Sequence, residues 1–411
     1  MRVKLSDVCV EGGIQTGPFG AQLHQSDYSE WGTPVCMPVN LVDGSISENG
    51  IARVSEEHVE RLSRYKVKRG DLLYARRGDV GRGSLVGAHE DGWLCGTGCL
   101  KVTPDPSKID SRYLFYLTSL PETIGWLVNH AKGTTMLNLN TAILSSLPLE
   151  IERNLEKQRR IAEVLSAYDE LIENNRRQIK LLEEAAQRLY REWFIDLKFP
   201  GHETTPIHDG LPDGWQKGNL LDCADVYRGK SYTSDNLDDS GNMRLANLNS
   251  IAPYGGWAFG AEKPYKGECK AEQLISSGDV IMAVTDMTKE RRLVGHVARV
   301  PKRADGFLIS MDLIKLVPKS VTVNYLYAAL RFSGVAEMIA MLANGTNVLH
   351  LKPDALSRVD FVSPDRETQE RFSVVSELLF AMCERLEQKA ALAREARDRL
   401  LPKLMSGEIE V

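Results

Sequence analysis

The chain carries one sequence plan twice, and the second copy begins about 210 residues after the first. Gly70-Asp71-Leu72-Leu73-Tyr74-Ala75 is echoed by Gly278-Asp279-Val280-Ile281-Met282-Ala283, and each run predicts a turn followed by a buried strand. The segment 133–139 returns at 345–351, and the segment 156–161 returns at 367–372. Because the echoes keep their order and nearly constant spacing, they indicate an internal duplication, which constrains the architecture more than any single motif does.

Each copy ends in a long charged segment with a seam of heptad-spaced side chains. The first seam comprises Ile161, Leu165, Tyr168, Ile172, Asn175, Ile179, Leu182, Ala186, Leu189 and Trp193. The second comprises Phe372, Val375, Leu379, Met382, Leu386, Lys389, Ala393, Ala396 and Leu400, with a stop at Pro402 and Gly407. A helix of about 40 residues extends roughly 60 Å and buries no seam alone, so we expect an antiparallel coiled coil rather than separate packing on each domain. Asn175 and Lys389 are expected to fix its register.

These features predict a mixed α/β fold, with two α/β globules separated by two long helices and related by internal pseudo-twofold symmetry. The globular parts are rich in Gly, β-branched runs and turn signals, which is typical of many short strands. The expected segments are a first globule at 1–150, a spacer helix at 151–198, a second globule at 199–362 and a second spacer helix at 363–411.

Composition excludes several classes of protein. Charged residues make up 26% of the chain, and no stretch approaches the roughly 20 apolar residues that a spanning helix needs, so no membrane association is expected. The N-terminus has no apolar signal core, which predicts a cytoplasmic protein. Seven scattered cysteines are typical of reduced thiols rather than a disulfide framework.

One sequence motif suggests catalysis. Residues 224–231 satisfy a permissive phosphate-loop pattern that ends in Gly229-Lys230-Ser231, so a nucleotide hydrolase using Lys230 is a hypothesis to test. Its flanks do not predict the required strand and helix, and the first copy has no counterpart. Cys95 and Cys99 have no second pair at zinc-like spacing, and the eight histidines are dispersed. We therefore expect no catalytic residue, no metal and no cofactor in this chain.

The distribution of charge is more informative than its total. A net charge of −5 argues against a general nucleic-acid coat. Within 61–90, however, eight basic residues stand against three acidic ones, and within 286–305 six stand against three. Both clusters follow the Gly-Asp strand of their copy, which favours contact with a long polyanion such as double-stranded DNA over an ordinary solvated surface.

Candidate DNA contacts follow from the side chains that pair best with base edges and phosphates, since Arg suits guanine and Asn or Gln suits adenine. In the first copy they are Gln15, Thr16, Gln22, His24, Asn40, Arg76, Arg77, Arg82, Lys132 and Thr134. In the second they are Arg228, Lys230, Tyr232, Asn247, Asn249, Lys289, Arg291, Arg292, Asn344 and Asn347. The alternative for each is turn chemistry, because Gly, Asn and Thr belong in loops. The alternative for the whole chain is a coiled-coil scaffold that binds proteins without DNA specificity.

Two regions resemble a known family. The run from Gln158 to Asn175, continued to Phe194, resembles the central conserved region of the specificity subunits of type I restriction–modification enzymes. The run Arg399-Leu400-Leu401-Pro402-Lys403-Leu404-Met405-Ser406-Gly407-Glu408-Ile409 resembles their distal conserved end. Residues 16–23, followed by Ser26-Asp27-Tyr28, resemble a common opening of their target-recognition domains.

The resemblance implies that each globule is a target-recognition domain reading one half of an asymmetric, bipartite DNA site. The paired helices would set the gap between the halves and dock two methylation subunits, which use S-adenosylmethionine for adenine-N6 methylation. Restriction subunits with ATP- and magnesium-dependent activity would join them. The resemblance thus agrees that this chain is non-catalytic by itself.

Overall fold

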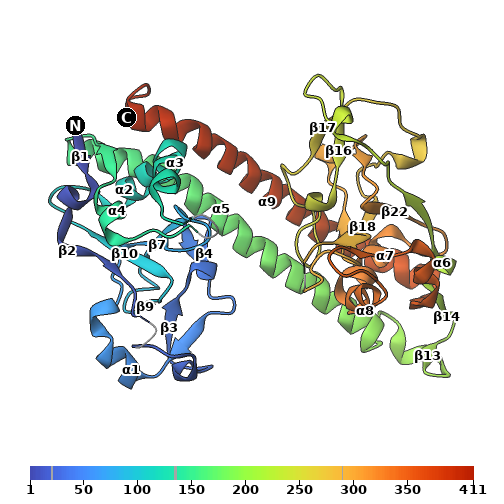
Figure 1. Cartoon of the computed structure of the whole chain (residues 1–411). Helices are drawn as coiled ribbons and strands as arrows, with labels where there is room; N and C mark the ends of the chain where they lie inside the picture. The colour runs from blue at the N-terminus through green and yellow to red at the C-terminus, as the bar shows by residue number, and fades with distance from the viewer. Residues whose placement is uncertain (20–21, 134–136, 289) are drawn as a thin grey trace. The chain divides into compact units, whose positions relative to one another are not determined.

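The structure is a computed structural model that describes residues 1–19, 22–133, 137–288 and 290–411 (Figure 1). It contains two compact units: unit 1 comprises Met1–Leu171 and Ala393–Val411, and unit 2 comprises Ile172–Leu392. Two long helices, α5 (Leu155–Tyr190) and α9 (Arg366–Ser406), each contribute one part to each unit.

Unit 1 is built on a four-stranded antiparallel sheet in the order β2-β10-β7-β8, with strands Cys9–Thr16, Cys99–Pro104, Leu72–Ala75 and Gly83–Leu85. A second sheet has the order β6-β3-β9, with strands Ala52–Val54, Thr33–Cys36 and Leu94–Cys95. Two ribbons pair β1 (Arg2–Lys4) with β11 (Pro148–Glu150), and β4 (Leu41–Val42) with β5 (Ser45–Ile46). The shorter helices are α1 (Glu56–Arg61), α2 (Ser111–Thr118), α3 (Pro121–His130) and α4 (Thr141–Ser145).

Unit 2 has a four-stranded antiparallel sheet in the order β15-β22-β18-β20, with strands Ala224–Arg228, Leu313–Pro318, Val280–Ala283 and Val297–Arg299. Its second sheet has the order β17-β16-β21, with strands Lys263–Tyr265, Met243–Ala246 and Leu308–Ile309. Three ribbons pair β14 (Gln216–Asn219) with β24 (Asp360–Ser363), β19 (Thr285–Asp286) with β23 (Leu349–His350), and β12 (Ile207–His208) with β13 (Leu211–Pro212). The shorter helices are α6 (Leu220–Cys223), α7 (Val323–Phe332) and α8 (Val335–Met341).

The two units share one topology. Each has a four-stranded antiparallel main sheet with the same strand order, a mixed three-stranded sheet whose last pair is parallel, and a ribbon that joins an early strand of the unit to the strand before its long helix. This confirms the prediction of a mixed α/β fold with two sheet-rich halves and two long helices.

The repeated glutamine of the duplicated sequence explains part of this symmetry. Gln158 in α5 is buried, accepts a hydrogen bond from the backbone N–H of Asp110 at 2.8 Å, and donates to the carbonyl of Glu152. Gln369 in α9 is also buried, accepts from the backbone N–H of Thr322 at 2.7 Å, and donates to the carbonyl of Pro364. Each glutamine therefore fastens the start of a long helix to the residue before α2 or α7.

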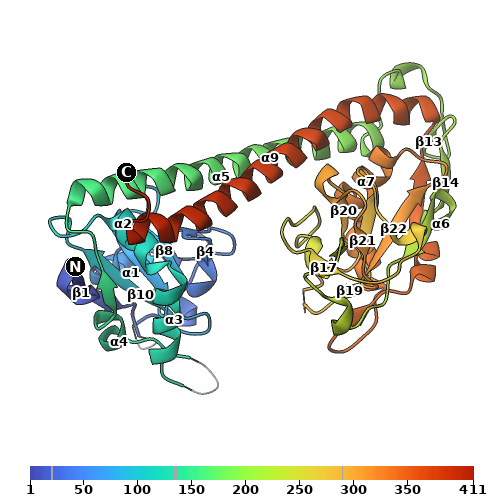
Figure 2. The ribbon, with the colours of Figure 1, turned by 90° about the horizontal axis from the view of Figure 1, so that it is seen from above.

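The two long helices pack side by side and antiparallel (Figure 2). In unit 1 the start of α5 shares a core with the end of α9, through Ile161 and Leu165 on one helix and Leu401 and Leu404 on the other. In unit 2 the aromatic end of α5 and the short π-helix after it (Arg191–Ile195) pack on the start of α9, with the Trp193 and Phe372 ring centroids 5.9 Å apart.

The first predicted seam is confirmed, because every one of its members is buried or half-buried, including Asn175. The second predicted seam is confirmed only in part, because Phe372, Leu379, Leu386, Ala393, Ala396 and Leu400 are buried or half-buried but the other three members are not. Val375, Met382 and Lys389 are exposed, whereas Ser376, Phe380 and Ala390 are buried. Apolar residues occupy more than one face of this part of α9, so sequence spacing alone did not identify the face that packs. Lys389 therefore does not act as a buried register residue.

The end of α9 differs slightly from the prediction. The helix continues through Pro402 and ends at Ser406, before Gly407 with its left-handed φ of 77°. All seven cysteines are free, as expected for reduced thiols. In the described part of the chain, each helix is too short or too polar to cross a lipid bilayer.

Candidate nucleic-acid interface

In unit 1, the segment that follows β7 is joined to a distant loop by backbone hydrogen bonds. The N–H of Leu139 donates to the carbonyl of Arg76 at 2.8 Å, and Asn138 forms a β-bridge with Arg77. Asn138 and Lys132 also exchange two backbone hydrogen bonds of 2.7 and 3.0 Å, which close the loop between them. We call this arrangement of bridge and closed loop the backbone staple of unit 1.

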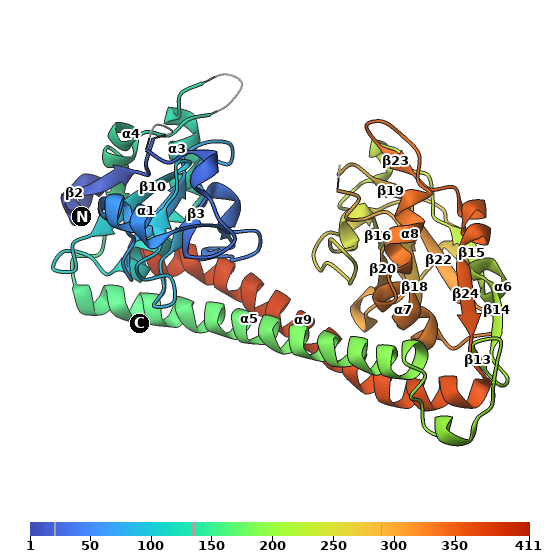
Figure 3. The same ribbon diagram turned by 90° about the horizontal axis from the view of Figure 1, so that it is seen from below.

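Unit 2 contains the same staple, which involves the strands β19 and β23 labelled in Figure 3. The N–H of Leu351 donates to the carbonyl of Val284 at 2.8 Å, and His350 pairs with Thr285 between β23 and β19. Asn344 and His350 exchange hydrogen bonds of 2.8 and 3.0 Å. His350 therefore stands where Asn138 stands in unit 1, and Asn344 stands where Lys132 does.

The staple shows that the two basic clusters are not at equivalent positions, which corrects the sequence-based expectation. Val284 and Thr285 of unit 2, both buried, occupy the places of Arg76 and Arg77. The loop after the Gly-Asp strand spans residues 76–81 in unit 1 and 284–295 in unit 2, between closing bonds from Ala75 and from Ala283. The arginines of unit 2 lie in the additional residues of the longer loop.

In both units a glycine follows the first strand of the main sheet and is hydrogen-bonded to the neighbouring strand. The N–H of Gly17 donates to Cys99, and that of Gly229 donates to Leu313. A Cβ on Gly17 would lie 1.8 Å from the carbonyl oxygen of Gly96, and a Cβ on Gly229 would lie 2.0 Å from that of Ser310. Both positions therefore require glycine, because two backbones approach too closely for any side chain.

Several predicted residues of unit 1 come together around the staple. The Arg76 guanidinium lies 5.8 Å from the ring centroid of Phe19 and donates to the Asn138 side chain at 3.2 Å. Phe19, Arg76 and Arg77 line the same surface depression, and Arg77, Lys132 and His24 are exposed. The result is a basic surface with an exposed aromatic ring, which suits contact with phosphates and base edges.

Other predicted residues of unit 1 support the loops instead. Gln22 accepts a 2.7 Å hydrogen bond from the Tyr65 hydroxyl, and Gln15 donates to the carbonyl of Gly12. Thr16 is half-buried at the end of β2. Arg82 lies 3.6 Å from Asp79, and its buried Nε has no acceptor within the described residues. Thr134 lies outside the described residues.

The predicted residues of unit 2 divide in the same way. Arg228, Asn249, Asn344 and Asn347 are exposed, and Lys230 is half-buried next to Ser310. Arg291 donates to the carbonyl of Ala340 at 2.9 Å, which fastens it to the end of α8. Arg292 is half-buried, and its Nε lies 3.7 Å from Glu290. Tyr232 packs on a small cluster with Leu245 and Leu308, and burial raises the pKa of its hydroxyl. Lys289 lies outside the described residues.

Asn40 and Asn247 are buried, so neither amide reaches a surface that DNA could contact. Asn40 accepts from the backbone of Met37 and donates to Ser47. Asn247 accepts from Asn249 and donates to the carbonyl of Ala261 at 2.7 Å. Both asparagines organise the turn after the central strand of the three-stranded sheet, which is the turn chemistry that their residue type also allows.

Asp286 supports this surface from the interior of unit 2, and the sequence did not identify it as a candidate. It is fully buried at the end of β19, and its carboxylate accepts backbone hydrogen bonds from Thr288, Leu293 and Val294 at 2.6, 2.6 and 3.0 Å. Burial alone would raise its pKa, but these hydrogen bonds outweigh burial and lower the pKa. An acidic residue inside a basic segment was the only sequence signal for this role.

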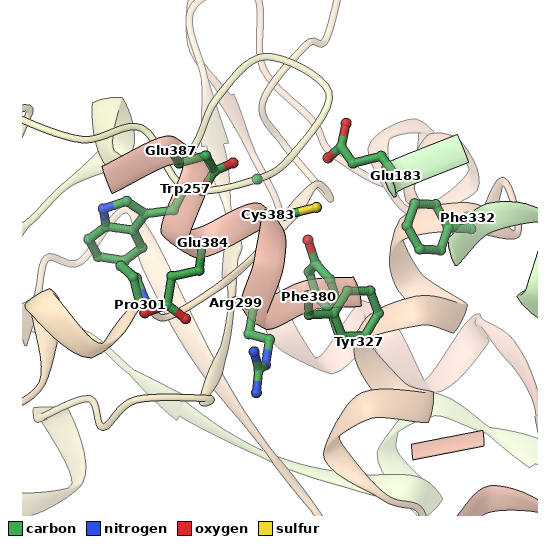
Figure 4. A pocket seen from close by; sticks show the side chains of 11 residues that line it. Glu183, Trp257, Arg299, Pro301, Tyr327, Phe332, Phe380, Cys383, Glu384 and Glu387 are labelled. Carbon is green, nitrogen blue, oxygen red and sulfur yellow. The ribbon is translucent and has the colours of Figure 1, made fainter. Parts of the chain in front are cut away.

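The phosphate-loop hypothesis fails on geometry. Residues 224–228 form β15, and a loop rather than a helix follows Ser231, so no helix N-terminus is available for phosphate. Among the described residues, no group of three His, Cys, Asp or Glu side chains is placed to hold a metal. A pocket of about 40 Å³ in unit 2, lined by residues such as Trp257, Tyr327 and Glu387, has room for about one water molecule (Figure 4).

Comparisons with known proteins assign this arrangement to a class. Residues 21–184 match the family model for the type I restriction modification DNA specificity domain. The chain is 24% identical to the type I restriction enzyme MjaIX specificity subunit of Methanocaldococcus jannaschii, over 83% of this chain and 78% of that protein. It is 22% identical to the HindI specificity subunit of Haemophilus influenzae, over 83% of this chain and 86% of that protein.

The fold is also that of a solved relative. The crystal structure of a type I restriction–modification S subunit from M. genitalium matches with a TM-score of 0.61 and 15% identity, covering 98% of this chain and 96% of that one. Along most of its length, the chain is therefore similar to the DNA specificity subunits of type I restriction–modification systems.

Proposed function

We propose that each unit reads one half of an asymmetric, bipartite site in double-stranded DNA. The observation that carries this proposal is the recurrence of the backbone staple, which presents polar and basic side chains at the same end of the main sheet in both units. The side chains themselves differ, with Arg77 and Lys132 in unit 1 and Arg292 and Asn344 in unit 2. Equivalent frameworks with different side chains are suited to two different half-sites.

The long helices are proposed to set the gap between the half-sites and to dock two methylation subunits. Val374, Leu378 and Met382 lie four residues apart on α9 and are 69, 66 and 49% exposed. Residues at this spacing share one face of a helix, so they form an apolar stripe that the described residues leave uncovered. Such a stripe supports a protein partner on α9.

The chemistry is assigned to the partners. The methylation subunits would supply S-adenosylmethionine-dependent adenine methylation, and restriction subunits would supply ATP- and magnesium-dependent cleavage. The proposed segments are a first target-recognition domain at 1–150, a second at 199–362, and spacer helices at 151–198 and 363–411.

Selection of bound sequences from randomised duplexes tests the proposal, using the full chain with its methylation subunits. We expect two short conserved blocks separated by a fixed gap, and a steep loss of affinity as salt is raised. Arg77→Ala should change one block and Arg292→Ala the other. Lys108→Ala and Lys319→Ala are matched controls, because these lysines follow β10 and β22 at the opposite end of the main sheets. Enrichment of no sequence would contradict DNA reading and favour a protein scaffold.

A further inference from the structure

The longer loop of unit 2 needs a means of support that the shorter loop of unit 1 does not. In unit 1 the loop turns at Gly78 and Gly81, which both have left-handed φ, and Arg76 is tied to Asn138. In unit 2 the loop has no glycine between Asp286 and Val294. A segment of this length without glycine turns would otherwise sample many conformations.

The Asp286 carboxylate supplies this support. The carboxylate accepts backbone hydrogen bonds from Thr288 on the outgoing side of the loop. It also accepts from Leu293 and Val294 on the returning side, so it joins the two sides. Hydrogen bonds to a buried charged acceptor are about twice as strong as neutral ones. The Thr288 hydroxyl adds a fourth contact by accepting from the N–H of Arg292 at 3.1 Å.

The backbone around the two arginines shows that the loop is held in one conformation. Arg291 has a left-handed φ of 53°, which costs free energy for a residue with a side chain and persists only when its surroundings impose it. Its guanidinium donates a hydrogen bond to the carbonyl of Ala340. Arg292 donates its N–H to Thr288 and gives its carbonyl to Tyr254, while its side chain remains 43% exposed. Arg291 is thus an anchor, and Arg292 is the arginine whose side chain is partly exposed and not tied to α8.

We propose that Asp286 is a positioning residue for sequence recognition by unit 2, holding Arg292 in the orientation in which it meets DNA. The proposal rests on the function proposed above, because it requires unit 2 to read a half-site. Asp286 itself is fully buried, so it would act through the loop and not by touching DNA. Its role has no counterpart in unit 1, where Gly78 occupies the corresponding place.

Asp286→Asn tests this in the full chain with its methylation subunits. The amide keeps one acceptor oxygen but replaces the other with an N–H₂ group, which would face backbone donors that now lack an acceptor. We expect discrimination between sequences at the half-site of unit 2 to fall at least about tenfold, the size of one well-placed base contact. The half-site of unit 1 should stay unchanged, and Asp213→Asn, an exposed acid of the same unit, should change neither.

A double-mutant cycle with Arg292→Ala separates positioning from general destabilisation. If Asp286 acts through Arg292, Asp286→Asn should reduce discrimination no further once Arg292 is absent. Additive losses, or unchanged discrimination in a folded Asp286→Asn protein, would overturn the proposal. If Asp286→Asn does not fold, Thr288→Val removes only the hydroxyl that accepts from Arg292, and it should give a smaller loss at the same half-site. A wild-type protein without sequence preference would instead contradict the proposed function.

Discussion

The two units share their topology but attach their long helices by different polar contacts. In unit 1, Asp169 of α5 accepts hydrogen bonds from Arg397 of α9 and from the Tyr116 hydroxyl of α2. The repeat places Phe380, Ala186 and Ala328 at the corresponding positions of unit 2. In unit 2, Arg299 of β20 makes two 2.7 Å contacts with Glu377 of α9, which also accepts from Asn324. Leu85, Ser166 and Arg112 stand there in unit 1.

This difference shows which parts of a duplicated fold are free to diverge. The buried glutamines, the close glycines and the backbone staple are common to both units, because backbone geometry requires them. The polar contacts to the helices are not shared by the two units. Asp169 of unit 1 corresponds to Phe380 of unit 2, for example, and Arg299 of unit 2 corresponds to Leu85 of unit 1. The α/β region of unit 2 could therefore not take the helix segments of unit 1 without placing Arg299 opposite Ser166, where its acidic partner is missing.

Alanine at either shared glycine should have the largest effect. Gly17→Ala and Gly229→Ala place a Cβ within about 2 Å of a carbonyl oxygen, so the loop or the strand must move. We expect each to lower the free energy of unfolding by about 3 kcal/mol and to abolish recognition of one half-site. Urea unfolding and sequence selection measure the two effects.

The matched control for the glycines is Gly125→Ala in α3, where no atom lies within 4 Å of an added Cβ. It should stabilise the helix by up to about 1 kcal/mol. Tolerance of alanine at one of Gly17 and Gly229 would show that the two units do not use this contact in the same way.

Removal of the contact specific to unit 1 should have an intermediate effect. Asp169→Ala leaves the half-buried Arg397 guanidinium and the Tyr116 hydroxyl without their shared acceptor, which should cost about 2 kcal/mol in urea unfolding. In unit 2, Arg299→Leu installs the residue of unit 1 and should cost less than about 1 kcal/mol, because Glu377 is half-exposed and leucine still packs on Phe380.

Arg399→Ala is the control for these charges, since its pair with Glu395 is exposed on one helix. Its effect should stay within about 0.5 kcal/mol. Equal losses from Asp169→Ala and Arg399→Ala would mean that the contact in unit 1 contributes no more than a surface pair.

The smallest expected effect is a pH dependence located in unit 2. Burial is the main cause that raises the pKa of Glu387 to about 8, and the neighbouring Glu183 and Glu384 add to it. The nearby Arg331 offsets little of this rise, because it is already paired with Glu183 at 3.1 Å. The folded protein then keeps a proton that the unfolded chain releases above about pH 4.5. The stability contributed by this proton is complete below that pH and is lost as the pH rises through 8.

Glu387→Gln should remove this part of the pH dependence. We expect the variant to lose less unfolding free energy than the wild type between pH 5 and pH 9, as measured by urea unfolding at each pH. Glu395→Gln, on an exposed turn of the same helix, should leave the profile of the wild type unchanged. A parallel shift of Glu387→Gln at all pH values would contradict a titrating Glu387.

Much of the fold was predictable from the duplication, because two copies of Gly-Asp strands, glutamines and long helices imply one topology used twice. The first seam followed from spacing. The second followed only in part, since α9 offers apolar residues such as Val374 and Val375 on neighbouring faces, and only packing selects between them.

The candidate site was predictable by region but not by residue. Part of each basic segment lies in the loop after β7 or β18, beside the backbone staple, yet Asn40 and Asn247 are buried in turns that their residue type equally favours. The extra residues in the loop of unit 2 hid the fact that Val284 and Thr285, not arginines, match Arg76 and Arg77. The role of Asp286 depends on three backbone groups converging from both sides of that loop, which no local sequence pattern encodes.

The backbone staple also bears on how a chain of this kind can acquire new preferences. Its bonds join N–H and carbonyl groups, so Lys132 and Asn344, or Asn138 and His350, occupy the same places without altering it. Mutation at these positions can therefore proceed with little penalty to folding, and the two copies already differ at each of them. The backbone framework can therefore stay the same while its exposed side chains change. Related sequences could come to bind different targets in this way without a change of fold.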